Sequence, residues 1–147
     1  VFWLFRNDRG GLEMIITKIW FKDDRIYGLT NDGETVWQSL LWYKRLRNAS
    51  NDDRNNYEID DEGIHWYELD EDISFESFGY SDPEPVGVSK LFLTHPELNP
   101  SAVAKRIGIS PFLMTQFVNG TRKPSKECES KIFNEIRIIA ENLLAVK

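Results

Sequence analysis

The segment SDPEPVGVS, residues 81–89, divides the chain into two parts of different character. It holds two prolines, a glycine, two serines and two acidic residues, and its apolar residues follow no period. Such a composition is typical of a short linker between folded regions. A chain of 147 residues can form one ordinary domain or two small ones. We therefore predict one domain over residues 14–80, a linker over 81–87 and a second domain over 88–147.

Charge is distributed unevenly between the two parts. Residues 1–88 carry 9 Lys/Arg and 19 Asp/Glu, a net charge of −10, whereas residues 89–147 carry 9 Lys/Arg and 5 Asp/Glu, a net charge of +4. The total of −6 argues against a general nucleic-acid binder. The asymmetry indicates instead that the two parts have different partners.

Composition disfavours several classes of protein. Cys128 is the single cysteine, so the sequence cannot form an intrachain disulfide. No apolar run approaches the roughly 18 residues that span a bilayer, and the first apolar run is shorter than a signal peptide requires. We therefore expect a cytoplasmic protein with no membrane partner.

Arg-Gly-Gly at 9–11 is what a purine-rich ribosome-binding site gives when read as codons, so we expect natural translation to begin at Met14.

Runs of β-branched and aromatic residues predict strands in the first domain. The connections KDDR (22–25) and NDG (31–33) are short turn signals, so the first three strands are expected to form an antiparallel meander. Ser39 and Ser74 can each cap a helix. The predicted elements are strands 14–21, 26–30, 34–38, 57–59 and 63–69, helices 39–49 and 72–78, and a polar loop 50–56. The fold class of this domain is therefore predicted as α+β, a small antiparallel sheet with one or two helices.

Helix signals dominate the second domain, which is predicted to be all-α. A first short helix begins at residue 88 and ends at Pro96. Caps and prolines mark the starts of the next three helices, at Asn99–Pro100 or Ser101, at Ser110–Pro111 and at Pro124–Ser125. Asn119–Gly120 ends the third helix, because glycine adopts positive φ readily. The last helix is long, with apolar residues at steps of three to four: Cys128, Ile132, Phe133, Ile136, Ile139, Ala140, Leu143 and Leu144.

Residues 102–119 match the spacing of a helix-turn-helix motif. Ala104 is small enough for the second helix to approach closely, and Gly108 lies at the turn, where positive φ is needed. The predicted inward residues are Val103, Ile107, Ile109, Met114 and Phe117. The alternative is a plain helical hairpin with an exposed polar face. The inward pattern, the capped helix starts and the adjacent basic cluster together favour DNA binding.

The outward face of the second motif helix is predicted to contact base edges. Gln and Asn amides can pair with adenine, and Thr can meet a base edge or a thymine methyl group. The predicted base-contact residues are Ser110, Pro111, Phe112, Thr115, Gln116 and Asn119. Basic residues on the first motif helix and just beyond the second are predicted to contact phosphates. These are Lys105, Arg106, Arg122 and Lys123.

The run A-x-x-x-G-I-S…NGTRKPS, residues 104–125, resembles the pattern of lambda-repressor-like, Cro/repressor-type helix-turn-helix domains. The resemblance extends over residues 88–144. It implies that the second motif helix enters the major groove and that a homodimer binds a palindromic, double-stranded DNA operator. Phe112 and Leu113 depart from the pattern, since polar residues are usual there. Phe112 is then either a contact to a thymine methyl group or an interface residue.

The segment GIHWYELDEDIS, residues 63–74, is rich in ionisable side chains. Its carboxylates fit no EF-hand loop, which disfavours a metal site. An acid–base pair would need a cleft and a second reactive group. Strand alternation places His65 opposite Ile64 and Trp66, which favours a hydrogen-bonded structural histidine. We therefore expect no enzyme activity, no metal and no cofactor, and a solvated acidic face that can attract a basic protein partner.

Residues 14–78 resemble a small bacterial family of uncharacterised domains. The residues that carry the resemblance are F-x-D (21–23), NDG (31–33), LLWYKRL, YEI and GIHWYELDEDIS. Members of that family occur as single domains or fused to a helix-turn-helix, and some are considered to be antitoxins of toxin–antitoxin pairs. The resemblance implies an antitoxin role for this chain, and it implies no enzymatic activity.

These features predict a two-domain cytoplasmic regulator of transcription. The second domain is expected to bind its operator as a homodimer and to repress its own gene. The acidic first domain is expected to sense a ligand, to dimerise or to hold a basic protein partner. The alternative is a protein–protein adaptor whose helix-turn-helix does not bind DNA, which the acidic composition and Phe112 favour.

Overall fold

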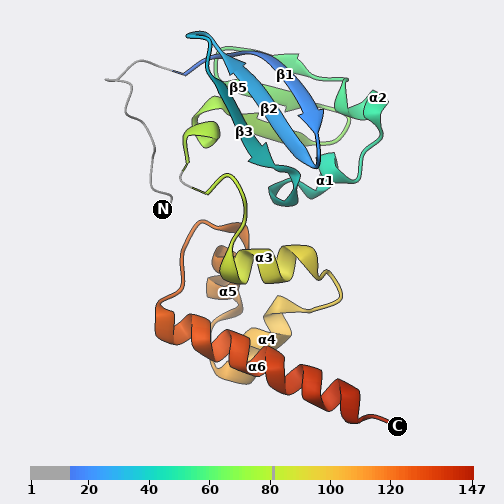
Figure 1. The fold of residues 1–147 in the computed structure, drawn as a ribbon, viewed down its shortest axis with the longest axis vertical. Helices are drawn as coiled ribbons and strands as arrows, with labels where there is room; N and C mark the ends of the chain where they lie inside the picture. The colour runs from blue at the N-terminus through green and yellow to red at the C-terminus, as the bar shows by residue number, and fades with distance from the viewer. Residues whose placement is uncertain (1–13, 81) are drawn as a thin grey trace. The chain divides into compact units, whose positions relative to one another are not determined.

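A computed structural model describes residues 14–80 and 82–147, and the predicted translation start concerns residues 1–13, which lie outside this range. The chain divides into two compact units, one ending at Glu84 and the other beginning at Pro85. The first unit is built from β-strands and short helices, and the second is helical (Figure 1). The α+β fold class predicted from the sequence is therefore confirmed. No helix among the described residues is long and apolar enough to cross a bilayer.

Three antiparallel strands form the first sheet, in the order β1-β2-β3. They are β1 (Ile16–Lys22), β2 (Arg25–Thr30) and β3 (Thr35–Ser39). The turn between β1 and β2 places Asp23 and Asp24 at positive φ, 52° and 58°, a conformation that aspartate tolerates better than most residues. Gly33 has a φ of 89° in the next turn, where glycine adopts the conformation at no steric cost. The predicted meander is confirmed.

A second antiparallel sheet follows, in the order β4-β5-β6. Its strands are β4 (Glu58–Ile59), β5 (Gly63–Trp66) and β6 (Glu71–Ser74). The Asp60 carboxylate fixes the turn between β4 and β5, because its Oδ1 accepts hydrogen bonds from the backbone N–H groups of Glu62 and Gly63 at 2.8 and 2.9 Å. β5 is shorter than the predicted strand 63–69, since the chain turns after Trp66 and Asp70 takes a φ of 51°.

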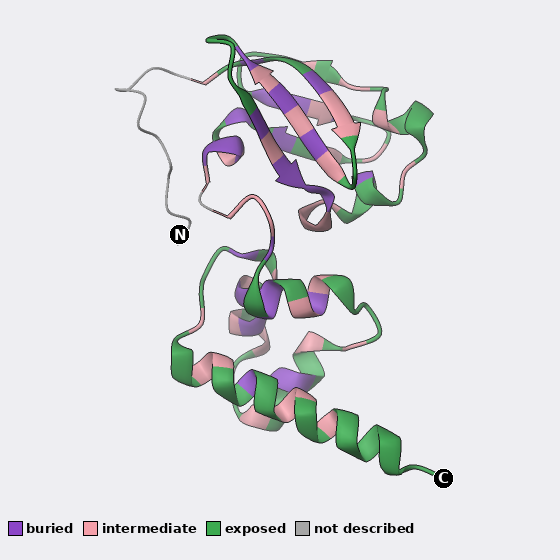
Figure 2. Cartoon of the chain, viewed as in Figure 1, coloured by how far each residue is buried: buried purple, intermediate pink, exposed green. Residues whose placement is uncertain are grey.

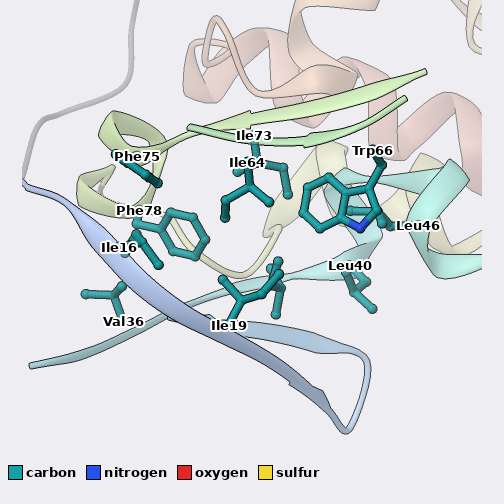
Figure 3. Close-up of a cluster of buried hydrophobic side chains, with 11 residues drawn as sticks. Ile16, Ile19, Val36, Leu40, Leu46, Ile64, Trp66, Ile73, Phe75 and Phe78 are labelled. Carbon is teal, nitrogen blue, oxygen red and sulfur yellow. The ribbon is translucent and has the colours of Figure 1, made fainter. Parts of the chain in front are cut away.

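The core of the first unit lies between the two sheets. Figure 3 shows Ile64 and Ile73 from the second sheet pointing toward Ile16, Ile19 and Val36 from the first. Full burial of such a side chain contributes about 1.5–3 kcal/mol to folding. The buried cluster comprises Ile16, Ile19, Ile26, Val36, Leu40, Leu46, Ile64, Trp66, Ile73, Phe75 and Phe78.

The prediction of one continuous helix over 39–49 is wrong. Ser39 does cap a helix, but this is the 3-10 helix η1 (Leu40–Trp42), and a break at Tyr43 separates it from α1 (Lys44–Arg47). The break lets both Leu40 and Leu46 reach the core at 0% exposure. The burial of these two side chains, and not helical propensity, therefore determines the backbone conformation of residues 39–49.

Two further predictions in the first unit are corrected. The predicted loop 50–56 contains α2 (Asn51–Arg54), because the Ser50 hydroxyl oxygen accepts a hydrogen bond from the Asp53 N–H and caps the turn. The predicted helix 72–78 is strand β6 followed by the 3-10 helix η2 (Phe75–Gly79). Residues 72–74 pair with β5 as part of β6, and the Ser74 side chain caps η2.

The described part of the second unit forms four α-helices around a core of its own. They are α3 (Gly87–Thr94), α4 (Pro100–Ile107), α5 (Pro111–Asn119) and α6 (Lys126–Ala145). Figure 2 shows that α6 is buried over part of its length and exposed toward its C-terminal end. α3 begins at Gly87, so the predicted linker 81–87 overlaps its first residue. The buried residues are Val88, Phe92, Val103, Ala104, Met114, Phe117 and Ile132.

Candidate nucleic-acid interface

A sharp turn joins α4 to α5. Gly108 ends α4 in the left-handed conformation, with φ 77° and ψ 25°, and a Cβ at this position would meet no atom within 4 Å. The backbone conformation, and not crowding, is thus what favours glycine here. The N–H of Ile109 donates to the Ala104 carbonyl at 3.0 Å, and the Ser110 Oγ accepts hydrogen bonds from the N–H groups of Phe112 and Leu113. The turn therefore closes α4 and starts α5 within three residues.

The residues predicted to lie on the inner faces of α4 and α5 are all buried or half-buried. Val103, Met114 and Phe117 are 3%, 0% and 4% exposed. Ile107 and Ile109 are half-buried and pack against the same core. Ala104 is fully buried, and a small residue there leaves room for the neighbouring helix. These contacts fix which face of α5 remains outside the core.

Four of the six predicted base-contact residues are exposed on or next to α5. Ser110, Phe112, Thr115 and Asn119 are exposed, whereas Pro111 and Gln116 are half-buried. Phe112 is 72% exposed, an unusual value for a phenylalanine. The six residues thus run along α5 from its N-cap, Ser110, to its last residue, Asn119, with both apolar and polar groups among them.

Several of these polar groups already form local hydrogen bonds. The Ser110 oxygen caps α5, and the Thr115 hydroxyl donates to the Pro111 carbonyl at 3.0 Å. The Asn119 Oδ1 accepts from both the N–H and the hydroxyl of Thr121, which leaves the Asn119 amide N–H groups as donors. Gln116 forms no side-chain hydrogen bond within the described residues. Its amide is therefore the polar group on this face best able to pair with an external partner.

The predicted phosphate-contact residues lie at two places. Lys105 and Arg106 are exposed near the end of α4, and Arg122 and Lys123 are exposed in the segment after α5. The backbone N–H of Arg122 donates to the Gln116 carbonyl at 3.3 Å, which holds this segment against the end of α5. The Arg106 Nε donates to the Glu135 Oε1 on α6, an ion pair that joins residues 29 positions apart. This pairing was not predicted from the sequence, because it depends on the packing of α6 against α4.

The buried hydroxyl of Ser89 helps to hold α5 in place, and this contact was not predicted from the sequence. Ser89 on α3 is 8% exposed, and its Oγ donates to the Phe117 carbonyl of α5 at 2.7 Å. A serine surrounded by apolar residues in a helix would have been a signal for such a bond, since buried hydroxyls are nearly always hydrogen-bonded. The bond ties α3 to the last turn of α5.

The acidic segment of the first unit contains a bridged histidine. The His65 Nδ1 lies 2.7 Å from the Asp72 Oδ1, and its Nε2 lies 2.7 Å from the Asp60 Oδ2. Tyr67 stacks on the imidazole with a centroid distance of 5.9 Å. The hydrogen bond to Asp72, together with that to Asp60, raises the pKa of His65 above 6.5 despite some desolvation. Two backbone N–H donors, with help from His65, lower the pKa of Asp60 below 3.8.

This arrangement joins three strands and their turns. Glu58, His65 and Asp72 are direct cross-strand neighbours on β4, β5 and β6. Within residues 14–80 and 82–147, no group of three or more His, Cys, Asp or Glu side chains is placed to hold a metal ion. The chemistry that the geometry supports at His65 is a charged hydrogen bond between strand β6 and the turn before β5.

A face of the first sheet that the sequence analysis did not single out carries aromatic and basic residues together. Trp20, Tyr27 and Trp37 are paired across the three strands. Lys18 and Arg25 lie against two of these rings. The signal in the sequence was the alternation of Lys18, Trp20 and Lys22 along one strand, but the row itself depends on the register between strands.

Comparison with protein families gives one match. A family model described as "Protein of unknown function (DUF2442)" matches residues 16–82, just under half of the chain. The N-terminal unit is thus similar to an uncharacterised family, and the match does not extend to the four-helix unit. No curated protein matches the chain significantly, and no solved structure does.

Proposed function

We propose that this protein is a sequence-specific DNA-binding regulator of transcription, in which α5 reads base edges in the major groove. The observation that carries the proposal is the construction around α5. A left-handed glycine, a serine cap and a buried inner face fix this short helix, while its outer side exposes polar groups beside a basic segment. A helix of this kind fits the width of the major groove of B-DNA.

Base recognition is assigned to the exposed side of α5. Gln116, whose amide forms no hydrogen bond within the described residues, would pair bidentately with adenine. The side-chain N–H groups of Asn119, which donate no hydrogen bond within the described residues, and the methyl group of Thr115 would make the adjacent contacts. Phe112, 72% exposed, would pack on a thymine methyl group. Ser110 and Pro111 bring the start of the helix to the groove.

Phosphate contacts are assigned to basic residues flanking α5. Residues 85–147 carry 9 Lys/Arg and 5 Asp/Glu, so this unit is positively charged overall. Lys105, Arg122 and Lys123 are exposed on the same unit as α5. Arg106 would reach a phosphate only by leaving Glu135, so we expect it to contribute less than Lys105. Each such contact releases counterions and makes binding dependent on salt.

A homodimer is proposed because one helix reads too few bases for tight binding. The second half of α6 exposes several apolar side chains, which a second copy would cover. These are Ile138, Leu143 and Leu144, and Val146 just after the helix is also exposed. Two copies of α5 would then face half-sites about 34–36 Å apart on a palindromic operator. The operator proposed first is the promoter of the protein's own gene.

The N-terminal unit is proposed to hold a basic protein partner on its acidic side. Residues 14–84 carry 7 Lys/Arg and 17 Asp/Glu, and Glu58 and Asp72 stand on the strands of the second sheet. If the partner is a toxin, the chain is its antitoxin, and partner binding and autorepression are coupled. Two observations favour the alternative of an adaptor that binds no DNA: the exposed Phe112 and the engagement of Arg106 by Glu135.

A mobility-shift experiment distinguishes the two functions. The full chain is titrated onto its own promoter and onto a random duplex of equal length, at two salt concentrations. The proposal predicts selective binding to the promoter that weakens as salt is raised. Equal binding to both duplexes, or none, would exclude operator recognition by the chain alone and would favour the adaptor.

A further inference from the structure

The outer side of the β1–β3 sheet carries a row of three aromatic rings. Trp20 pairs with Tyr27, and Tyr27 pairs with Trp37, so the three side chains stand on the same face. The rings of Trp20 and Tyr27 stack at 5.7 Å with an interplanar angle of 7°. The neighbouring residues Ile19, Ile26 and Val36 are buried in the core instead, and burial alternates along β2 (Figure 2).

Basic residues surround this row. The Arg25 guanidinium lies 3.8 Å from the centroid of the Trp37 ring, and the Lys18 Nζ lies 5.9 Å from that of Trp20. Lys22 pairs directly with Arg25 across the strands. We call these six residues the aromatic face: Lys18, Trp20, Lys22, Arg25, Tyr27 and Trp37. The strands β1, β2 and β3 contain no acidic residue, although residues 14–84 have 17.

The aromatic face consists mainly of hydrogen-bond donors. Lys18 and Lys22 form no ion pair within the described residues, and neither indole N–H of Trp20 or Trp37 has a partner there. An indole N–H and an ammonium group can donate but cannot accept. The partner of such a surface must therefore supply acceptors and negative charge. A second copy of the same face is disfavoured, since like charges would meet.

The unit already holds one segment of suitable chemistry at the edge of this sheet. The Pro83 carbonyl accepts hydrogen bonds from the Trp42 indole N–H at 3.2 Å and from the Ser39 N–H at 2.8 Å. The next residue, Glu84, lies 3.9 Å from Arg25, so an acidic, proline-containing segment meets a tryptophan and an arginine. Proline offers a carbonyl acceptor and no N–H, which matches a surface of donors.

We propose that the aromatic face binds an extended, acidic, proline-containing segment of another protein. Backbone carbonyls would accept from the indole N–H groups of Trp20 and Trp37, and carboxylates would pair with Lys18 and Lys22. Proline rings would pack against the outer edges of the ring row, and an extended proline-containing segment loses little entropy on binding. This surface is distinct from α5 and does not depend on DNA binding.

Single-stranded nucleic acid is the other anionic partner that aromatic surfaces bind. It requires open ring faces on which bases stack. Here Trp20 and Tyr27 cover one another, and Arg25 covers a face of Trp37. The geometry therefore favours the peptide, and an oligonucleotide serves as a comparison ligand.

The test uses the full chain and a synthetic peptide of alternating glutamate and proline. Binding is followed by NMR through the indole N–H resonances and by calorimetry, beside a glutamine–proline peptide and oligothymidylate. The variant Lys18→Gln/Lys22→Gln removes two charges from the aromatic face. Lys44→Gln/Lys90→Gln is the matched control, since both of its lysines are exposed and lie outside that face.

The proposal predicts saturable binding of the glutamate peptide, with shifts at the indole resonances of Trp20 and Trp37. We expect the Lys18→Gln/Lys22→Gln variant to bind it roughly five- to tenfold more weakly and the control variant to bind as the native chain does. The proposal is overturned by no saturable binding at about 1 mM peptide, or by equal affinity for the glutamine peptide. Tighter binding of oligothymidylate would also overturn it, and so would equal losses in the two variants.

Discussion

Gly108 shows how one residue decides whether α5 can be presented. Its φ of 77° lies in the left-handed region, and a side chain there would meet open space. Any cost of substitution is therefore a backbone cost, because only glycine adopts this conformation freely. The Ser110 cap and the buried Met114 depend on the same turn, so the orientation of the helix follows from this one position.

Replacing Gly108 with alanine should destabilise the helical unit by about 1–2 kcal/mol, the cost of left-handed backbone in a residue with a Cβ. Urea unfolding followed by circular dichroism measures the change. Gly108→Asn is the informative control, since asparagine tolerates this conformation and should recover most of the loss. If alanine were as stable as glycine, the turn would not be held by the backbone conformation described here.

His65 makes the stability of the first unit depend on pH. Its pKa is raised in the folded state, so the protonated bridge stabilises fully below pH 6.5 and the contribution is lost as pH rises through the raised pKa. Asp60 behaves in the opposite sense, because its lowered pKa gives a contribution that is present above pH 3.8 and is lost in stronger acid. The bridge is therefore strongest between these two limits.

We expect the midpoint of thermal unfolding to fall modestly between about pH 6 and about pH 8 in the native chain, as the imidazole loses its proton. His65→Gln should remove most of this slope, since glutamine does not titrate. Thermal scans over that range, with His95→Gln as the control for the second histidine, measure the effect. An unchanged slope in His65→Gln would mean that the bridge does not contribute.

At the scale of elements, α6 has two roles along its length. Its first half buries Ile132 in the core and pairs Glu135 with Arg106 of α4. Its second half exposes Leu143 and Leu144, which are 67% and 86% exposed. Burial of such side chains at an interface is favourable by the same hydrophobic effect that forms the core. The exposed end is thus the part of the unit to which the proposed dimer is assigned.

Leu143→Glu/Leu144→Glu should convert the dimer to a monomer without unfolding the chain, because neither residue contributes to the core. Operator binding should weaken by at least about tenfold, the equivalent of 1.4 kcal/mol. Sedimentation and mobility shifts measure the two effects, with the exposed pair Asn134→Glu/Asn142→Glu as a control of equal charge on the same helix. A variant that stays dimeric would place the interface elsewhere.

The whole molecule shows which features a sequence can predict. Strands β1 to β3 and the caps at Ser110 and Ser125 were predictable, since turn residues and capping hydroxyls act over a few positions. The break at Tyr43 was not, because it follows from the need to bury Leu40 and Leu46 together.

In the candidate site, too, some features were predictable from the sequence and others were not. The residues of α5 were assigned from local pattern, and the structure places them on one helix. The engagement of Arg106 and the hydrogen bond from Ser89 connect elements 28 or more positions apart, so no local pattern reports them. The aromatic face was missed for a related reason, since it exists only in the register between strands.

The central claim is that α5 reads sequence, and Gln116 tests it most directly. The measurement is the ratio of dissociation constants for the protein's own promoter and a random duplex, in the native chain and in Gln116→Ala, at constant salt. We expect Gln116→Ala to lose about 1–3 kcal/mol of affinity for the promoter and little for the random duplex, so that the selectivity for the promoter falls. Lys105→Ala should instead weaken binding to both duplexes alike. An equal loss on both duplexes in Gln116→Ala, with the ratio unchanged, would contradict base reading by this helix.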